Sequence, residues 1–166
     1  MAETEGVREG YHLEWPNREK ASSRVTKLVV ILLLVASAAL IFIVTAGGWA
    51  KLEGAKPLQV LYIAVYLLMA FLVLRWNRGV LPLAAALAIV LGIFAAIAAP
   101  QWFTRSGPGY SAPALPEQVV GTLTMILLPV QILLILFAIR GFMQNWNVEV
   151  EVPDGEHYSP RDHGEV

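Results

Sequence analysis

Four long apolar stretches, separated by short polar segments, dominate the pattern of the chain. They cover residues 28–50, 57–75, 79–101 and 118–140, and their only Asp, Glu, Lys, Arg or His residues are Arg75 and Arg140 at two of the ends. As helices rising about 1.5 Å per residue, such stretches would be roughly as long as the hydrocarbon core of a bilayer is thick. They lack the strict alternation of a membrane barrel strand. The pattern therefore predicts four transmembrane helices.

The connections predict how these helices are arranged. Residues 51–56 and 76–78 are too short for anything but tight turns, so we expect successive helices to pack as hairpins. The third connection, 102–117, contains Pro108, Pro113 and Pro116 and is expected to be an irregular outer loop. The expected fold is an all-α integral membrane protein, an antiparallel four-helix bundle. Its transmembrane domain covers 28–141, between an N-terminal tail at 1–27 and a C-terminal tail at 142–166.

Basic residues predict the orientation, because Lys and Arg near helix ends resist translocation. Three basic residues lie at one end of the predicted bundle: Lys51, Lys56 and Arg105. Nine lie at the other end, in or next to the tails and the 76–78 turn: Arg8, Arg18, Lys20, Arg24, Lys27, Arg75, Arg78, Arg140 and Arg161. We expect both termini to be cytoplasmic, in a bacterial inner membrane. One tryptophan lies at or after the end of each span, as expected of interfacial anchors: Trp49, Trp76, Trp102 and Trp146.

The amino-acid composition limits the classes of function that the chain can have. The chain is 57% hydrophobic and 15% charged, with a formal charge of −1, so nothing suggests a nucleic-acid partner. It has no cysteine, and all three histidines lie in the tails. Because the hydroxyls of Ser37 and Thr45 have no activating base in the spans, and the spans contain no histidine or carboxylate to bind a metal, we expect no catalytic residue, no cofactor and no enzyme activity. In the C-terminal tail, Glu156, His157, Asp162 and His163 offer metal-ligand atoms, but without a recognised spacing, so no metal site is expected.

Gln131 is the most notable polar residue inside a span, two residues after Pro129. Proline removes a helix hydrogen bond and frees a carbonyl in the preceding turn. One interpretation is structural: the Gln131 amide satisfies that carbonyl or a facing helix. The other is functional: Pro129 and Gln131 mark a polar point on a path for a solute or lipid.

The helix at 79–101 carries small residues every four positions, Ala84, Ala88, Gly92 and Ala96. Small residues let helices approach closely in lipid, where packing drives association. This seam would make the helix central to the bundle or a docking face for another subunit. A helix so rich in alanine also produces such a pattern by chance.

The C-terminal tail alternates Val and Glu over residues 148–152, before Pro153, Asp154 and Gly155. Alternation followed by turn residues predicts a short strand. Because one strand cannot fold alone, we expect either an unfolded tail or an edge that pairs with a partner chain.

These features lead to one expectation about function and one alternative. We expect a small polytopic protein without catalytic chemistry of its own, an accessory or assembly subunit of a larger membrane complex. Its partners would be the lipid bilayer and either other membrane subunits or a second copy, contacted through the helix at 79–101. The alternative is a small oligomeric transporter or channel, with Gln131 and Pro129 in its path.

Overall fold

The computed structural model describes residues 7–104 and 112–159 and contains four long apolar helices in that part of the chain. These are α2 (Ala21–Gly47), α3 (Lys56–Leu74), α4 (Val80–Trp102) and α5 (Glu117–Met143). Each is long and apolar enough to cross a membrane, so the chain is a multi-pass membrane protein. Arg105, Pro108, Arg161, Asp162 and His163 from the sequence analysis lie outside the described residues.

Two helices extend beyond the predicted apolar stretches. Helix α2 begins at Ala21, seven residues before the expected start, and therefore includes Arg24 and Lys27. Helix α5 continues past Arg140 to Met143. Charge limits where a helix can enter lipid but does not end the helix, because Arg and Lys are good helix formers. The first and last turns of the bundle thus project past its apolar part.

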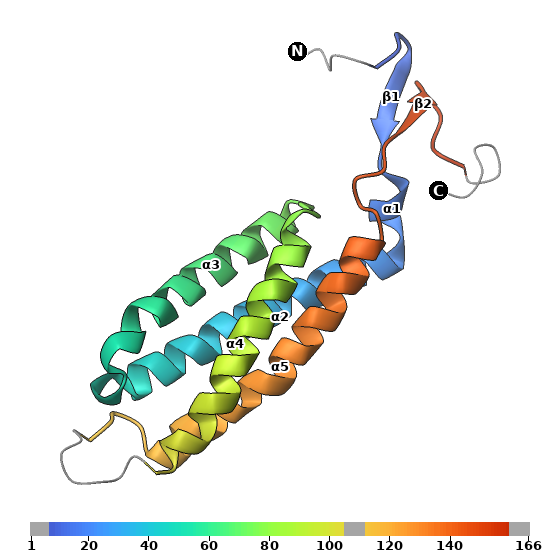
Figure 1. The fold of residues 1–166 in the computed structure, drawn as a ribbon. Coiled ribbons are helices and arrows are strands. Elements are labelled where there is room, and N and C mark those ends of the chain that lie inside the picture. The colour runs from blue at the N-terminus through green and yellow to red at the C-terminus, as the bar shows by residue number, and fades with distance from the viewer. Residues whose placement is uncertain (1–6, 105–111, 160–166) are drawn as a thin grey trace.

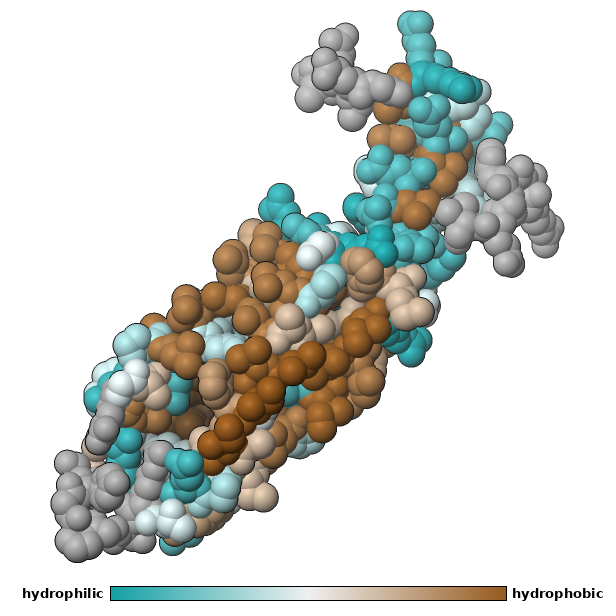
Figure 2. All heavy atoms as spheres, in the orientation of Figure 1, coloured by the Kyte–Doolittle hydropathy of each residue, from teal (hydrophilic) through white to brown (hydrophobic). Residues whose placement is uncertain are grey.

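The tails and connections are divided between the two ends of the helical bundle (Figure 1). The tails and the turn between α3 and α4 lie at one end of the bundle, called here the tail end. The other end, called the loop end, holds the two short 3₁₀ helices Trp49–Lys51 and Glu53–Ala55 and the connection from α4 to α5. In the space-filling view, hydrophobic residues cover the surface between the two ends, and hydrophilic residues gather at the ends (Figure 2).

Packing is uneven among the helices. Helix α2 packs against α3 and α5, α5 packs extensively against α4, and α3 makes little contact with α4. The expectation that the helices at 57–75 and 79–101 pack as a hairpin is therefore wrong beyond their turn (Figure 1). Small side chains on α4 explain the difference, because Ala84, Ala88 and Ala95 are buried and allow close approach to its neighbours.

The predicted small-residue seam is correct at its start and shifts at its end. Ala84 and Ala88 are fully buried and Gly92 is partly buried, but Ala96 is exposed. The buried face continues through Ala95 and Ala99 instead. An α-helix turns once every 3.6 residues, so a strict four-residue spacing drifts off a straight contact face after three turns. The seam is used inside the chain, mainly against α5.

The two tails fold together. Strand β1 (Tyr11–Glu14) pairs with β2 (Val150–Pro153) in an antiparallel sheet, with His12 opposite Val152 and Leu13 opposite Glu151. A short helix, α1 (Pro16–Glu19), connects β1 to α2. The strand at the C-terminal tail is confirmed, but it pairs with the N-terminal tail of the same chain, an outcome that neither expectation included. Figure 1 shows this two-stranded sheet standing beyond the helices at the tail end. Although its strands come from opposite ends of the chain, the sheet of β1 and β2 is called the hairpin below.

Candidate functional site

A chain of hydrogen bonds joins α2, α3 and α5 in the apolar interior of the bundle. Gln131 of α5 is 1% exposed. Its Oε1 accepts a hydrogen bond from the Tyr66 hydroxyl of α3 at 2.9 Å, and its Nε2 donates to Ser37 Oγ of α2 at 2.9 Å. The Ser37 hydroxyl in turn donates to the Leu33 carbonyl at 2.7 Å. The amide thus finds its partners on the facing helices.

Pro129 takes no part in this network. It is exposed on the outer face of α5, whereas Gln131, two positions on, points into the bundle. Two residues correspond to about 200° of helix rotation, so the two side chains leave opposite sides of the helix. The idea that Gln131 satisfies the carbonyl freed by Pro129 is therefore replaced by its bonds to Tyr66 and Ser37.

The remaining hydroxyl groups of the spans are also paired. Thr45 donates to the Ile41 carbonyl at 2.6 Å and contacts Oε1 of Gln59, and Thr124 donates to the Val120 carbonyl at 2.8 Å. Among the described residues, no buried side-chain nitrogen or oxygen atom lacks a hydrogen-bond partner. Buried polar groups that are satisfied internally stabilise a packed interior and leave little to bind a passing solute.

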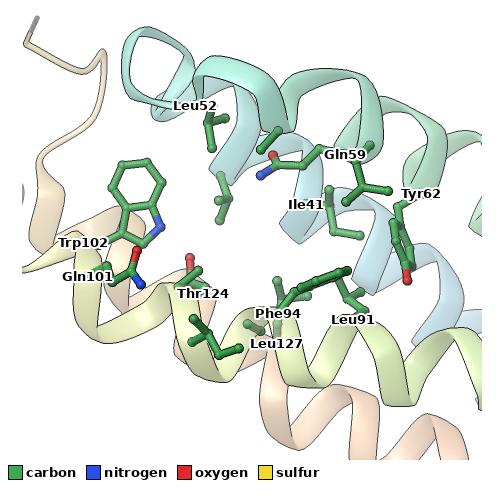
Figure 3. A pocket seen from close by; sticks show the side chains of 16 residues that line it. Ile41, Leu52, Gln59, Tyr62, Leu91, Phe94, Gln101, Trp102, Thr124 and Leu127 are labelled. Atoms are coloured by element: carbon green, nitrogen blue, oxygen red, sulfur yellow. The ribbon is translucent and has the colours of Figure 1, made fainter.

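A cavity of about 340 Å³ lies where α3 and α4 separate, towards the loop end. Its walls are mostly apolar, with Ile41 from α2, Leu91 and Phe94 from α4 and Leu127 from α5. Figure 3 shows Trp102, Gln101 and Thr124 at one side of this space and Gln59 and Tyr62 across it on α3. The cavity is therefore amphipathic: Gln59 and Gln101 lie towards the loop end, Tyr62 lies deeper along α3, and most of the remaining walls are apolar.

Two of the four predicted tryptophan anchors are buried in the protein. Trp49 is 50% exposed at the loop end, but Trp102 is 1% and Trp146 is 0% exposed. Trp102 forms part of the cavity wall, and its ring lies so close to Gly48 that a Cβ atom there would come within 2.4 Å of it. Neither buried ring can contact lipid headgroups, so the expected anchoring role is wrong for both.

Trp146 instead joins the helix ends at the tail end. Its ring packs edge-on against Trp76 with centroids 5.3 Å apart, and its Nε1 donates to Oε1 of Gln144 at 3.1 Å. Trp76, which is partly buried, has a φ of 62°, the left-handed conformation that usually falls to glycine after a helix. The Trp76 ring also contacts Lys27, whose Nζ lies 4.0 Å from the ring centroid. An unfavourable backbone conformation is thus accepted where it places a ring against Trp146.

Further hydrogen bonds fix the hairpin to this end of the bundle. Asn17 Nδ2 donates to the Asn145 carbonyl at 3.2 Å, and Arg18 Nε donates to the Trp146 carbonyl at 2.8 Å. Trp15 Nε1 donates to Glu149 Oε1 at 3.2 Å. Each bond links the N-terminal tail to the C-terminal tail, so the hairpin is held at its base by a set of contacts between residues about 130 positions apart.

Titratable side chains from both tails meet on the hairpin. Glu14 Oε1 lies 3.2 Å from His12 Nε2 and 2.8 Å from His157 Nδ1, and Glu14 Oε2 accepts the Tyr158 N–H at 2.8 Å. These hydrogen bonds, first that of His157, lower the pKa of Glu14 to about 2. The same pairing raises the pKa of His157. His12, Glu14 and His157 are the described residues that could hold a metal ion.

No protein-family model, curated protein or solved structure matches this chain. The site must therefore be interpreted from its own geometry. Of the residues singled out from the sequence, Gln131 lies in the interior polar network, and His157 lies in the cluster with Glu14. The cavity and the His12, Glu14 and His157 cluster were missed, because each is assembled from segments far apart in the chain, with no local spacing to reveal it.

Proposed function

We propose that this chain is an accessory or assembly subunit of a larger membrane complex. In this proposal the four helices anchor the protein, and the hairpin at the tail end is the part that contacts the partner. One observation carries the proposal: the two tails are built into a single ordered element and fixed to the helix ends. The bonds from Asn17 and Arg18 to the backbone beyond α5 fix its position.

The hairpin is costly to order and unnecessary for an anchor. An isolated two-stranded sheet is marginally stable in water, so the contacts at its base are what hold it. A two-stranded sheet also has two open edges, whose free N–H and C=O groups can pair with a strand of another protein. Such a rigid, water-facing edge suits a subunit whose task is contact with a partner.

The interior supports this function over a channel or transporter that uses Gln131. Both polar ends of the Gln131 amide are already bonded, to Tyr66 and Ser37. A solute passing this point would have to break those bonds in an apolar setting, where nothing replaces them. The bundle therefore suits a static anchor better than a polar path.

The proposed orientation is an antiparallel bundle with both termini in the cytoplasm of a bacterium, based on the excess of basic residues at the tail end. Because the chain has no cysteine, a single introduced thiol reports the location of its site. In intact cells Ala112→Cys at the loop end should react with a membrane-impermeant maleimide, and Ser159→Cys should react only after lysis. The reverse labelling pattern would invert the orientation.

The function is tested by photo-crosslinking in native membranes. A photoreactive amino acid at Tyr11, exposed on β1, should yield one stoichiometric cross-link to another membrane subunit, and the same probe at Ile132, exposed on α5, should react with lipid. The Tyr11 product should disappear when Trp146→Ala loosens the hairpin. Cross-links only to other copies of this chain, or none from Tyr11, would contradict an accessory role.

The cavity between α3 and α4 favours a second candidate function: a small transporter that takes up an amphiphilic molecule between these two helices. The amides of Gln59 and Gln101 towards the loop end match a polar head, and the mostly apolar walls match a chain lying between the helices. Ala98→Phe places a ring in the cavity, whereas Ile93→Phe changes an exposed position on the same helix. Loss of co-purifying lipid, measured by native mass spectrometry, in the first variant alone would favour this candidate.

A further inference from the structure

The hairpin brings three metal-ligand atoms together from the two ends of the chain. His12 and Glu14 are two positions apart on β1 and so leave the strand on the same face. The C-terminal segment turns at Gly155, whose φ of 93° favours glycine, and returns so that His157 reaches Glu14. One ligand atom from each of the three residues lies within 4.8 Å of the other two. Glu14 Oε1 is 3.2 Å from His12 Nε2 and 2.8 Å from His157 Nδ1.

We propose that His12, Glu14 and His157 form a binding site for a divalent transition-metal ion of the zinc class, which joins the two tails. Two imidazole nitrogens and one carboxylate oxygen are a donor set that Zn²⁺ accepts, with a fourth position left for water. The site goes beyond the proposed function and does not depend on the existence of a partner subunit.

Two of the three ligand–ligand distances are already close to those around a single ion. Zinc binds nitrogen and oxygen at about 2.0–2.2 Å, so two ligands of a tetrahedral ion lie about 3.4 Å apart. The contacts of Glu14 with the two rings, 3.2 Å and 2.8 Å, are within several tenths of an ångström of that spacing. His157 is exposed, with 94% of its side chain accessible, so its ring is free to adjust to the ion.

Outer contacts also hold two of the three ligands in place. The second nitrogen of His12, Nδ1, lies 3.4 Å from Asp154 Oδ1, and a carboxylate in that position orients a histidine that binds metal through its other nitrogen. The second oxygen of Glu14 accepts the Tyr158 N–H at 2.8 Å, which leaves Oε1 directed between the rings. Both contacts are of the kind that supports metal ligands from outside.

Metal binding would change the physical role of the hairpin. Without an ion, Glu14 holds the C-terminal segment through the Tyr158 N–H and the exposed His157 ring, and the ion pair with an exposed histidine contributes little in water. An ion with one ligand from β1's His12, one from Glu14 and one from His157 closes the chain from residue 12 to residue 157 into a loop. The hairpin would then be ordered when the metal is present and looser when it is removed.

The test uses the full chain in detergent micelles, purified through a tag without histidines and stripped with a chelator. Zn²⁺ alone is titrated in competition with a chromophoric indicator. We expect one equivalent per chain to bind, and His12→Gln, Glu14→Gln and His157→Gln each to weaken the affinity at least tenfold. Amide hydrogen exchange at Leu13 and Tyr158 should slow when Zn²⁺ is added to the wild-type protein.

Two matched controls separate the site from general binding by acidic or histidine side chains. Glu156→Gln removes a neighbouring exposed carboxylate, and His163→Gln removes the remaining tail histidine, so both should bind Zn²⁺ as the wild type does. Equal thermal unfolding of all variants without metal shows that the bundle is intact. No stoichiometric binding to the wild type, or binding that survives both His12→Gln and His157→Gln, would overturn the proposal.

Discussion

The Tyr66 hydroxyl and the Gln131 side chain form a 2.9 Å hydrogen bond that joins α3 to α5 inside the apolar bundle. These two helices have little other contact, because α3 rests on α2 and diverges from α4. Gln131 extends the connection to Ser37 on α2. One amide therefore links three helices, and its removal should weaken the connection between α3 and α5 most, because these two helices have little other contact.

We expect Gln131→Leu to destabilise the folded protein by about 1–2 kcal/mol, since a hydrogen bond between membrane helices contributes about 0.6 kcal/mol on average and this residue makes two. Tyr66→Phe should cost less, because Gln131 keeps its bond to Ser37. Unfolding of the purified protein in mixed micelles, as denaturing detergent increases, measures both variants. In a double-mutant cycle Gln131→Leu should couple to Tyr66→Phe and be additive with Pro129→Ala. Coupling to Pro129 would restore the kink interpretation.

The register of the α4 contact face gives a second prediction. Ala88 is fully buried and Ala96 is exposed, although both belong to the four-residue pattern read from the sequence. Ala88→Ile forces a branched side chain into a packed contact and should cost about 1–3 kcal/mol. Ala96→Ile should change stability little, since its side chain would face lipid. Equal melting temperatures for the two variants would contradict the register described for α4.

The sequence was sufficient for the features that depend on local composition. Each of the four helices was predicted from its own residues, because an apolar stretch of bilayer length is a local property. The pairing of helices was not local. The 76–78 turn predicted that α3 and α4 pack together, yet they separate, since the alanines of α4 gain closer contact with α5 than α3 can offer.

The candidate sites depend even more than the helix packing on contacts between residues far apart in the chain, which the sequence did not reveal. Gln131 was noticed as a polar residue in an apolar span, but its partners, Tyr66 and Ser37, are 65 and 94 positions away. Trp146 and Trp102 matched the interfacial pattern because an indole after a span looks the same whether it faces headgroups or a neighbouring helix. His12 and His157 meet only because β1 pairs with β2, and no spacing within either tail indicates that pairing.

Trp146 provides a third prediction, with Trp49 as a control of the same residue type. Trp146 packs against Trp76 and against the backbone at Gly141, where a Cβ atom would lie 3.1 Å from its ring. Trp146→Ala should therefore leave a cavity that costs about 3 kcal/mol and should make the tails sensitive to protease. Trp49 is half exposed, so Trp49→Ala should leave the tails resistant. If both variants were cleaved alike, the tail end would not depend on this ring.

The pairing of the tails can be tested by a cross-link, because the chain has no cysteine to interfere. Leu13 and Glu151 are directly opposite in the sheet, so Leu13→Cys with Glu151→Cys should form an intramolecular disulfide in the purified protein under mild oxidation. Val152 is one residue further on and faces the other side of the sheet, so Leu13→Cys with Val152→Cys should cross-link poorly. Gel mobility before and after reduction distinguishes a closed monomer from a linked dimer. A predominant dimer would mean that the strand at 150–153 pairs between two copies of the chain and not with the N-terminal tail of its own chain.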